Sequence, residues 1–201
     1  MSLTGREHRL VQLSAAIALG RWEILRELRR AAPPGEPDRG WREVVLQSHL
    51  FAGFPRAVEA ASVLSAAGGL GTLDPDELVP ADARDTAGRE LFDAIYGSGA
   101  AAVRAQLADY HPELAHWIAS HAYARVLSRP GLSADRRELA AVAALAAQGQ
   151  ERQLASHVRG ALRVGATAQE VREALEALRA LVDEPLLARA LDVAQHFARL
   201  E

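Results

Sequence analysis

Three features of the sequence predict an all-α protein. Apolar residues recur at intervals of three and four along most of the chain, which places them on one face of a helix. Two capping boxes, Thr4–Glu7 and Thr167–Glu170, mark helix starts near opposite ends of the chain. No segment shows the strict alternation of apolar and polar residues that a half-buried strand requires.

The first part of the chain, residues 1–67, predicts helices broken by glycine and proline. The helix that starts at Thr4 is expected to end near Gly20, because glycine accepts the conformation that closes a helix. A Pro- and Gly-rich loop at 31–40 is expected between the second helix and the third. These later helices are expected at residues 22–30, 41–52 and, after the interruption Gly53-Phe54-Pro55, 56–67.

The middle of the chain predicts a connector followed by more helices. Residues 68–87 are rich in Gly, Asp and Pro over most of their length, and we expect a linker or domain boundary there. Helices are expected at 88–96, at 100–110 and from Pro112 to about Ser128, since proline suits the first turn of a helix.

Residues 131–170 hold the most informative stretch. Ser133 is a good N-cap for a long apolar helix, and Gly149 is expected to end that helix. The next helix carries Gln150, Gln153 and His157 at spacings of three and four, so these side chains share one face.

Composition excludes several classes of function. The net charge of −3 gives no electrostatic reason to expect a nucleic acid or an anionic membrane as partner. The chain has no cysteine, which excludes disulfides, thiolate catalysis and thiolate-bound metal. His111, His116 and His121 do not share one helix face, so we predict no metal site, and no phosphate-binding loop or other cofactor motif is present. Without a signal peptide or a long apolar run, a cytoplasmic location is expected.

Three motifs carry a resemblance to a known family: RPGL at 129–132, RELAAVAALAAQG at 137–149 and QLASHVRGALRVGAT at 153–167. Their order and spacing are similar to those of the carboxymuconolactone decarboxylase family, which includes the alkyl hydroperoxidase D proteins. The resemblance implies a helical bundle of the alkyl hydroperoxidase D-like type.

The first part of the chain resembles a second, degenerate copy of the same plan. FAGFP at 51–55 aligns with LVDEP at 181–185, an offset of about 130 residues. We therefore predict two tandem copies: a first core at 1–67, a connector at 68–87, and extension helices plus the second core at 88–201. Because related single-copy proteins form trimers, the resemblance implies a homo-oligomer such as a trimer of fused pairs.

The resemblance also implies candidate site residues. Glu138 and His157 match the glutamate and histidine of the hydroperoxidase proton relay, and a carboxylate beside an imidazole suits general acid–base chemistry. The relay cysteines fall at Gln150 and Gln153, so a cysteine-dependent peroxidase is excluded. The alternative for Glu138 and His157 is a purely structural pair, with Glu138 in a first-turn salt bridge and His157 packed on its helix.

Cysteine-free relatives include the lactone decarboxylases. For these the resemblance implies an arginine that binds the carboxylate of the lactone substrate. Arg137 is the candidate for that task, His49 is a further catalytic candidate from the first copy, and Tyr123 lies at a position where relatives have an aromatic residue. Ala124 and Arg125 replace the glycine and acidic residue expected after it. The sequence thus favours a lyase acting on a small carboxylated or lactone-like substrate; the alternative is a catalytically inactive structural or binding paralogue.

Overall fold

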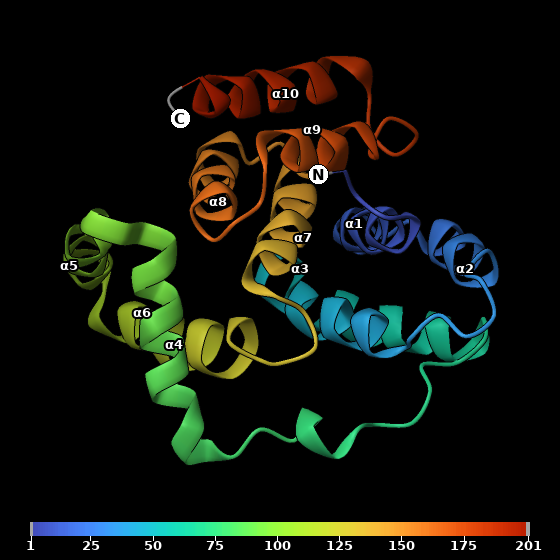
Figure 1. Cartoon of the computed structure of the whole chain (residues 1–201), viewed down its shortest axis with the longest axis horizontal. Helices are drawn as coiled ribbons and strands as arrows, with labels where there is room; N and C mark the ends of the chain where they lie inside the picture. The colour runs from blue at the N-terminus through green and yellow to red at the C-terminus, as the bar shows by residue number, and fades with distance from the viewer. Residues whose placement is uncertain (1, 200–201) are drawn as a thin grey trace.

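The computed structural model describes residues 2–199, and this part of the chain is helical, without any strand. Figure 1 shows a main bundle of helices with a smaller group of helices at one side of it. The helices are α1 (Gly5–Leu19), α2 (Trp22–Arg30), α3 (Arg39–Ala66), α4 (Ala81–Tyr96), α5 (Ala100–Tyr110), α6 (Pro112–Trp117), α7 (Ala134–Ala147), α8 (Glu151–Arg163), α9 (Ala168–Glu176) and α10 (Glu184–Ala198). Short 3₁₀ turns form η1 (Pro75–Glu77) and η2 (Gly97–Gly99), and η3 (Ile118–Leu127) is a π-helix. The all-α prediction is confirmed.

The predicted helix boundaries in the first part of the chain are confirmed with small shifts. Both capping boxes form, at Thr4 and at Thr167. Gly20 adopts φ 68°, in the left-handed region that glycine enters without a steric penalty, and ends α1. Gly53, with φ 81°, breaks the helical backbone within α3 just before Pro55.

Two boundaries in the middle of the chain differ from the prediction. The helix expected from Gly88 begins at Ala81, because Pro80 precedes a run of helix-forming residues that the Gly- and Asp-rich composition of the linker obscured. The helix expected from Pro112 to Ser128 does form, but beyond Trp117 it widens into the π-helix η3. Ser133 occupies the predicted N-cap of α7, although its side chain donates or accepts no capping bond.

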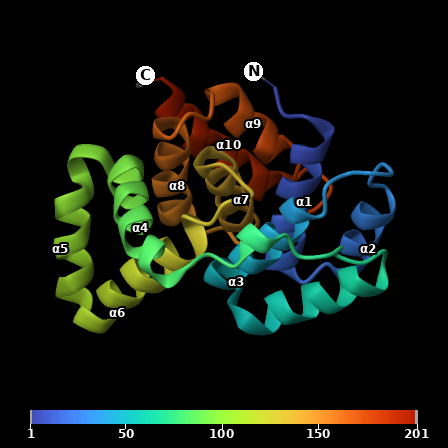
Figure 2. The ribbon, with the colours of Figure 1, turned by 60° about the horizontal axis from the view of Figure 1, so that its bottom comes forward.

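One apolar core joins the two ends of the chain. Helix α7 lies at its centre and packs against α1, α3, α8 and α9 (Figures 1 and 2). Residues 139–147 of α7 are all buried, as expected of a helix that is apolar all round. A second, smaller cluster joins α4 to η3 through Phe92, Ile95 and Tyr123.

The order of helix, left-handed glycine and helix occurs twice in the chain. Gly20 separates α1 from α2, and Gly149, also with φ 68°, separates α7 from α8. These segments share one core rather than forming separate cores. The tandem duplication itself stays a prediction.

A glycine sets the close contact between α4 and η3. A Cβ atom at Gly88 would lie 2.6 Å from Ala124 Cα, which no side-chain rotation can relieve. We expect Gly88→Ala to lower the free energy of unfolding by about 1–3 kcal/mol, the usual effect of overpacking. Urea unfolding followed by circular dichroism measures this change. Gly99→Ala is the matched control: nothing lies within 4 Å of its Cβ position, so equal destabilisation by both substitutions would contradict the contact.

None of the helices in residues 2–199 is long and apolar enough to span a membrane.

Candidate active site

Glu138 and His157 face each other between α7 and α8. The left-handed Gly149 reverses the chain between these helices, so α8 packs back along α7. His157 Nδ1 lies 2.9 Å from Glu138 Oε2, with the glutamate side chain 1% exposed and the histidine side chain 14% exposed. A carboxylate can only accept, so Nδ1–H donates this bond and Nε2 remains the ring nitrogen that can exchange a proton with a ligand.

Because Gly160 has no side chain, the Glu138 carboxylate can lie close to the backbone of α8 at this position. A Cβ atom at Gly160 would lie 2.7 Å from Glu138 Oε2 and 3.0 Å from Ile95 Cγ2. The sequence suggested no role for this glycine, because a glycine within a helix is usually only tolerated there.

Replacing Gly160 by alanine is expected to push the Glu138 carboxylate away from His157. The reason is that the new methyl group and the carboxylate oxygen cannot both fit, and we expect a loss of about 1–3 kcal/mol of stability as well. A crystal structure of the variant would show the displaced carboxylate. Gly5→Ala, with no neighbour of its Cβ closer than 3.6 Å, is the control, and an unchanged Glu138–His157 distance in Gly160→Ala would refute the expectation.

His157 opens onto a cavity of about 580 Å³. The cavity lies between α8 and the α4, α5, α6 and η3 segment, and the kinked helix α3 adds Leu50 and Phe51 to its wall. The Phe51 ring packs edge-on against the His157 ring, with 5.5 Å between the centroids. Glu138 does not line the cavity, so it acts on a ligand there only through His157.

Tyr123 lines the same cavity from η3. Its ring is 4% exposed and packs edge-on against Phe92 at 4.7 Å. Burial raises the pKa of the Tyr123 phenol, and the nearby Tyr96 and Glu138 raise it further. The phenol therefore stays protonated at neutral pH and can donate a hydrogen bond.

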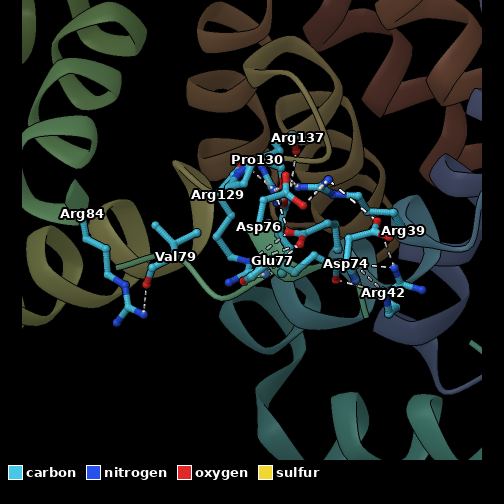
Figure 3. A network of polar contacts seen from close by, with 12 residues as sticks. Arg39, Arg42, Asp74, Asp76, Glu77, Val79, Arg84, Arg129, Pro130 and Arg137 are labelled. Carbon is cyan, nitrogen blue, oxygen red and sulfur yellow. Dashed lines mark hydrogen bonds and ion pairs between the residues drawn. The ribbon is translucent and has the colours of Figure 1, made fainter. Parts of the chain in front are cut away.

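Arg137 does not reach the cavity, so its expected role in substrate binding is not supported. Its side chain is 1% exposed and its Nη2 lies 2.7 Å from Glu43 Oε2 and 2.8 Å from the carbonyl oxygen of Arg129. Figure 3 shows it within a network of polar contacts that joins α3, η1 and the segment before α7. Arg129 also pairs with Glu43, and Arg42 pairs with the buried Glu77. The hydrogen bonds that Arg137 donates go to other residues of the protein, so they stabilise the fold.

Arginines of α8, rather than Arg137, line the cavity. Arg152, Arg159 and Arg163 line the cavity, spaced by seven and four residues along one face of the helix. Arg163 donates to the carbonyl oxygens of Ile95 at 3.1 Å and Tyr96 at 2.9 Å. Arg159 lies over the Phe197 ring, and Arg152 forms no hydrogen bond or ion pair with any other described residue. Sequence reasoning missed them because arginines on a helix usually form a solvated face.

The two glutamines at the relay positions differ in their placement. Gln153 lines the cavity one turn before His157. Gln150 is the N-cap of α8, is exposed and lies outside the cavity wall, so its expected contact with substrate is not supported.

His49 pairs with another histidine rather than with Glu138 and His157. Its Nε2 lies 2.7 Å from His121 Nε2, and its ring stacks on Phe54 with 4.5 Å between the centroids. Burial lowers the pKa of His121, and the nearby His49 and Arg125 lower it further. His49 is outside the cavity lining, so the expectation that it joins the catalytic pair is not supported. Within residues 2–199, His and acidic side chains form no cluster of three suited to a metal ion.

Comparison with known proteins gives the same family as the motifs. Residues 112–196 match the model of the carboxymuconolactone decarboxylase family, a segment that contains Tyr123, Glu138 and His157. The chain is also 36% identical over 67 residues to a 4-carboxymuconolactone decarboxylase of Acinetobacter baylyi. That match covers 33% of this chain and 50% of the relative, so the chain spans about half the length of the curated protein it matches. The predicted resemblance to the carboxymuconolactone decarboxylase family is thus confirmed for residues 112–196.

Proposed function

We propose that the protein is a cysteine-independent carboxy-lyase acting on a small carboxylated or lactone-like substrate. The observation that carries the proposal is the Glu138–His157 pair, whose imidazole opens onto a cavity also lined by arginines. A coupled carboxylate and imidazole is a common arrangement for moving a proton at neutral pH.

In the proposed reaction His157 supplies the proton that replaces carbon dioxide. The substrate loses its carboxylate as CO₂, the electron pair of the broken bond moves into the unsaturated lactone carbonyl system, and a proton from protonated His157 Nε2 then adds to carbon. Glu138 stabilises the imidazolium before that transfer and holds the ring in the Nδ1–H form after it. The reaction consumes one proton and releases one CO₂, so no oxidant or thiol is needed.

The cavity arginines and Tyr123 would hold the substrate. Arg152 has no partner among residues 2–199, so it suits a substrate carboxylate, and Arg159 lies on the same helix face. The protonated Tyr123 phenol would donate to a lactone oxygen, where negative charge develops as CO₂ leaves. Arg163, already bonded to two carbonyls, would mainly fix α8 against α4.

The name of the relative gives the first compound to test. We expect the protein to release CO₂ from 4-carboxymuconolactone or a related carboxylated lactone, with uptake of one proton per turnover. Val58→Asn, on an exposed side chain of α3, is the control for handling and folding. Folded protein that releases no CO₂ from any of a set of carboxylated γ-lactones would favour the alternative, an inactive structural or binding paralogue. We also propose a homo-oligomer, which sedimentation analysis of the same preparation would test.

A further inference from the structure

The cavity beside His157 has walls of opposite character. On one side α8 contributes Arg152, Arg159 and Arg163. On the other side the α5–α6 arm contributes Val103, Leu107 and Leu114. The arm lies at the outer edge of the molecule, away from the core around α7 (Figures 1 and 2).

The apolar wall is not fully covered by the rest of the chain. Helix α5 packs mainly on α4 and α6 rather than on the central core. Val103 and Leu107 are only half-buried, and Leu114 is 38% exposed. Apolar surface in contact with water is unfavourable until something apolar covers it.

The cationic wall indicates that the ligand is an anion. Among the described residues that line the cavity, none is acidic and three are arginine. The carboxylate of Glu138 lies behind His157 and is already paired with it. Arg152 has no partner among the described residues, so its charge is available to a ligand.

We propose that the cavity selects an amphipathic carboxylate, with its anionic end at Arg152 and His157 and an apolar body along Val103 and Leu107. This inference rests on the proposed function and specifies its substrate as a carboxylated lactone with an extended hydrocarbon or aryl group. The volume of about 580 Å³ falls in the range of pockets for drug-sized ligands rather than for a compact lactone alone.

Binding of a chain-length series to the full chain tests the proposal. The probes are butanoate, hexanoate, octanoate and decanoate, measured by calorimetry at pH 7. We expect the Kd to fall about two- to fourfold for each added methylene, as apolar burial predicts. Leu107→Asn should flatten that dependence, whereas Arg152→Gln should raise the Kd of every member roughly tenfold and keep the slope. The neutral 1-octanol should bind more weakly than octanoate.

The controls separate this proposal from the proposed reaction. Val58→Asn, a polar substitution at an exposed apolar residue away from the cavity, should leave the series unchanged, and the helical circular dichroism of each variant shows that it is folded. A Kd that does not vary with chain length, or a slope that Leu107→Asn leaves intact, would overturn the proposal. If the protein released CO₂ from a compact lactone but its Kd for the carboxylates did not vary with chain length, only the amphipathic substrate would be refuted. A steep series without CO₂ release would support the binding site and refute the lyase.

Discussion

Replacing His157 by glutamine is expected to lower the turnover of a carboxylated lactone by roughly 10²- to 10⁴-fold, the usual contribution of a general acid or base. Glutamine fills a similar space beside Phe51 but cannot carry the transferred proton. The arginines of α8 are untouched by this change, so the KM should vary by much less than kcat. Steady-state kinetics of CO₂ release gives both quantities.

Glu138→Gln is the companion to that substitution. Its amide can still accept a hydrogen bond from His157 but no longer stabilises the imidazolium, so we expect a smaller fall in kcat than for His157→Gln. The double variant should be no worse than His157→Gln alone, because Glu138 acts only through His157. A His157→Gln variant with kcat within threefold of wild type would remove His157 from the reaction.

The second large effect is expected on stability, at the buried pair of Glu43 and Arg137. Both side chains are essentially inaccessible to solvent, and the ion pair is 2.7 Å long. Glu43→Leu leaves the Arg137 guanidinium buried with only neutral partners, so we expect the free energy of unfolding to fall by about 3–5 kcal/mol. Urea unfolding monitored by circular dichroism measures the loss.

Two further variants make that prediction specific. Glu43→Leu combined with Arg137→Leu removes both charges and should recover part of the loss, since an apolar replacement of a whole buried pair is often tolerated. Asp93→Ala breaks the exposed pair with Arg104 and should cost less than about 1 kcal/mol. If Glu43→Leu were no more destabilising than Asp93→Ala, the buried network would not stabilise the fold.

The helices could be predicted from the sequence because their ends carry local signals. Gly20, Gly53 and Gly149 adopt left-handed backbone conformations, and capping boxes open α1 and α9, so these boundaries depend on neighbouring residues alone. The start of α4 at Ala81 and the π-helical widening after Trp117 carry no such signal. The π-helix η3 packs on α4 at Gly88, and such a contact between distant segments is not visible in a local sequence pattern.

The pairing of Glu138 with His157 could be predicted from the sequence, but the surroundings of the pair could not. Arg137 and Glu138 are adjacent in the motif, yet neighbours on a helix point about 100° apart. Glu138 therefore faces His157 on α8, while Arg137 faces Glu43 on α3. His49 likewise finds its partner, His121, in a segment 72 positions away. Spacing within one helix contains no information about such contacts.

In the proposed site Glu138 accepts a hydrogen bond from His157 Nδ1 and leaves Nε2 free at the cavity. Nitrogen-15 NMR of the histidine rings tests it directly, because the two ring nitrogens have different shifts when protonated and when not. For neutral His157 the structure predicts the Nδ1–H tautomer, with Nε2 unprotonated. Observation of the Nε2–H tautomer at His157 would contradict the pairing with Glu138, and with it the proposed route of the proton.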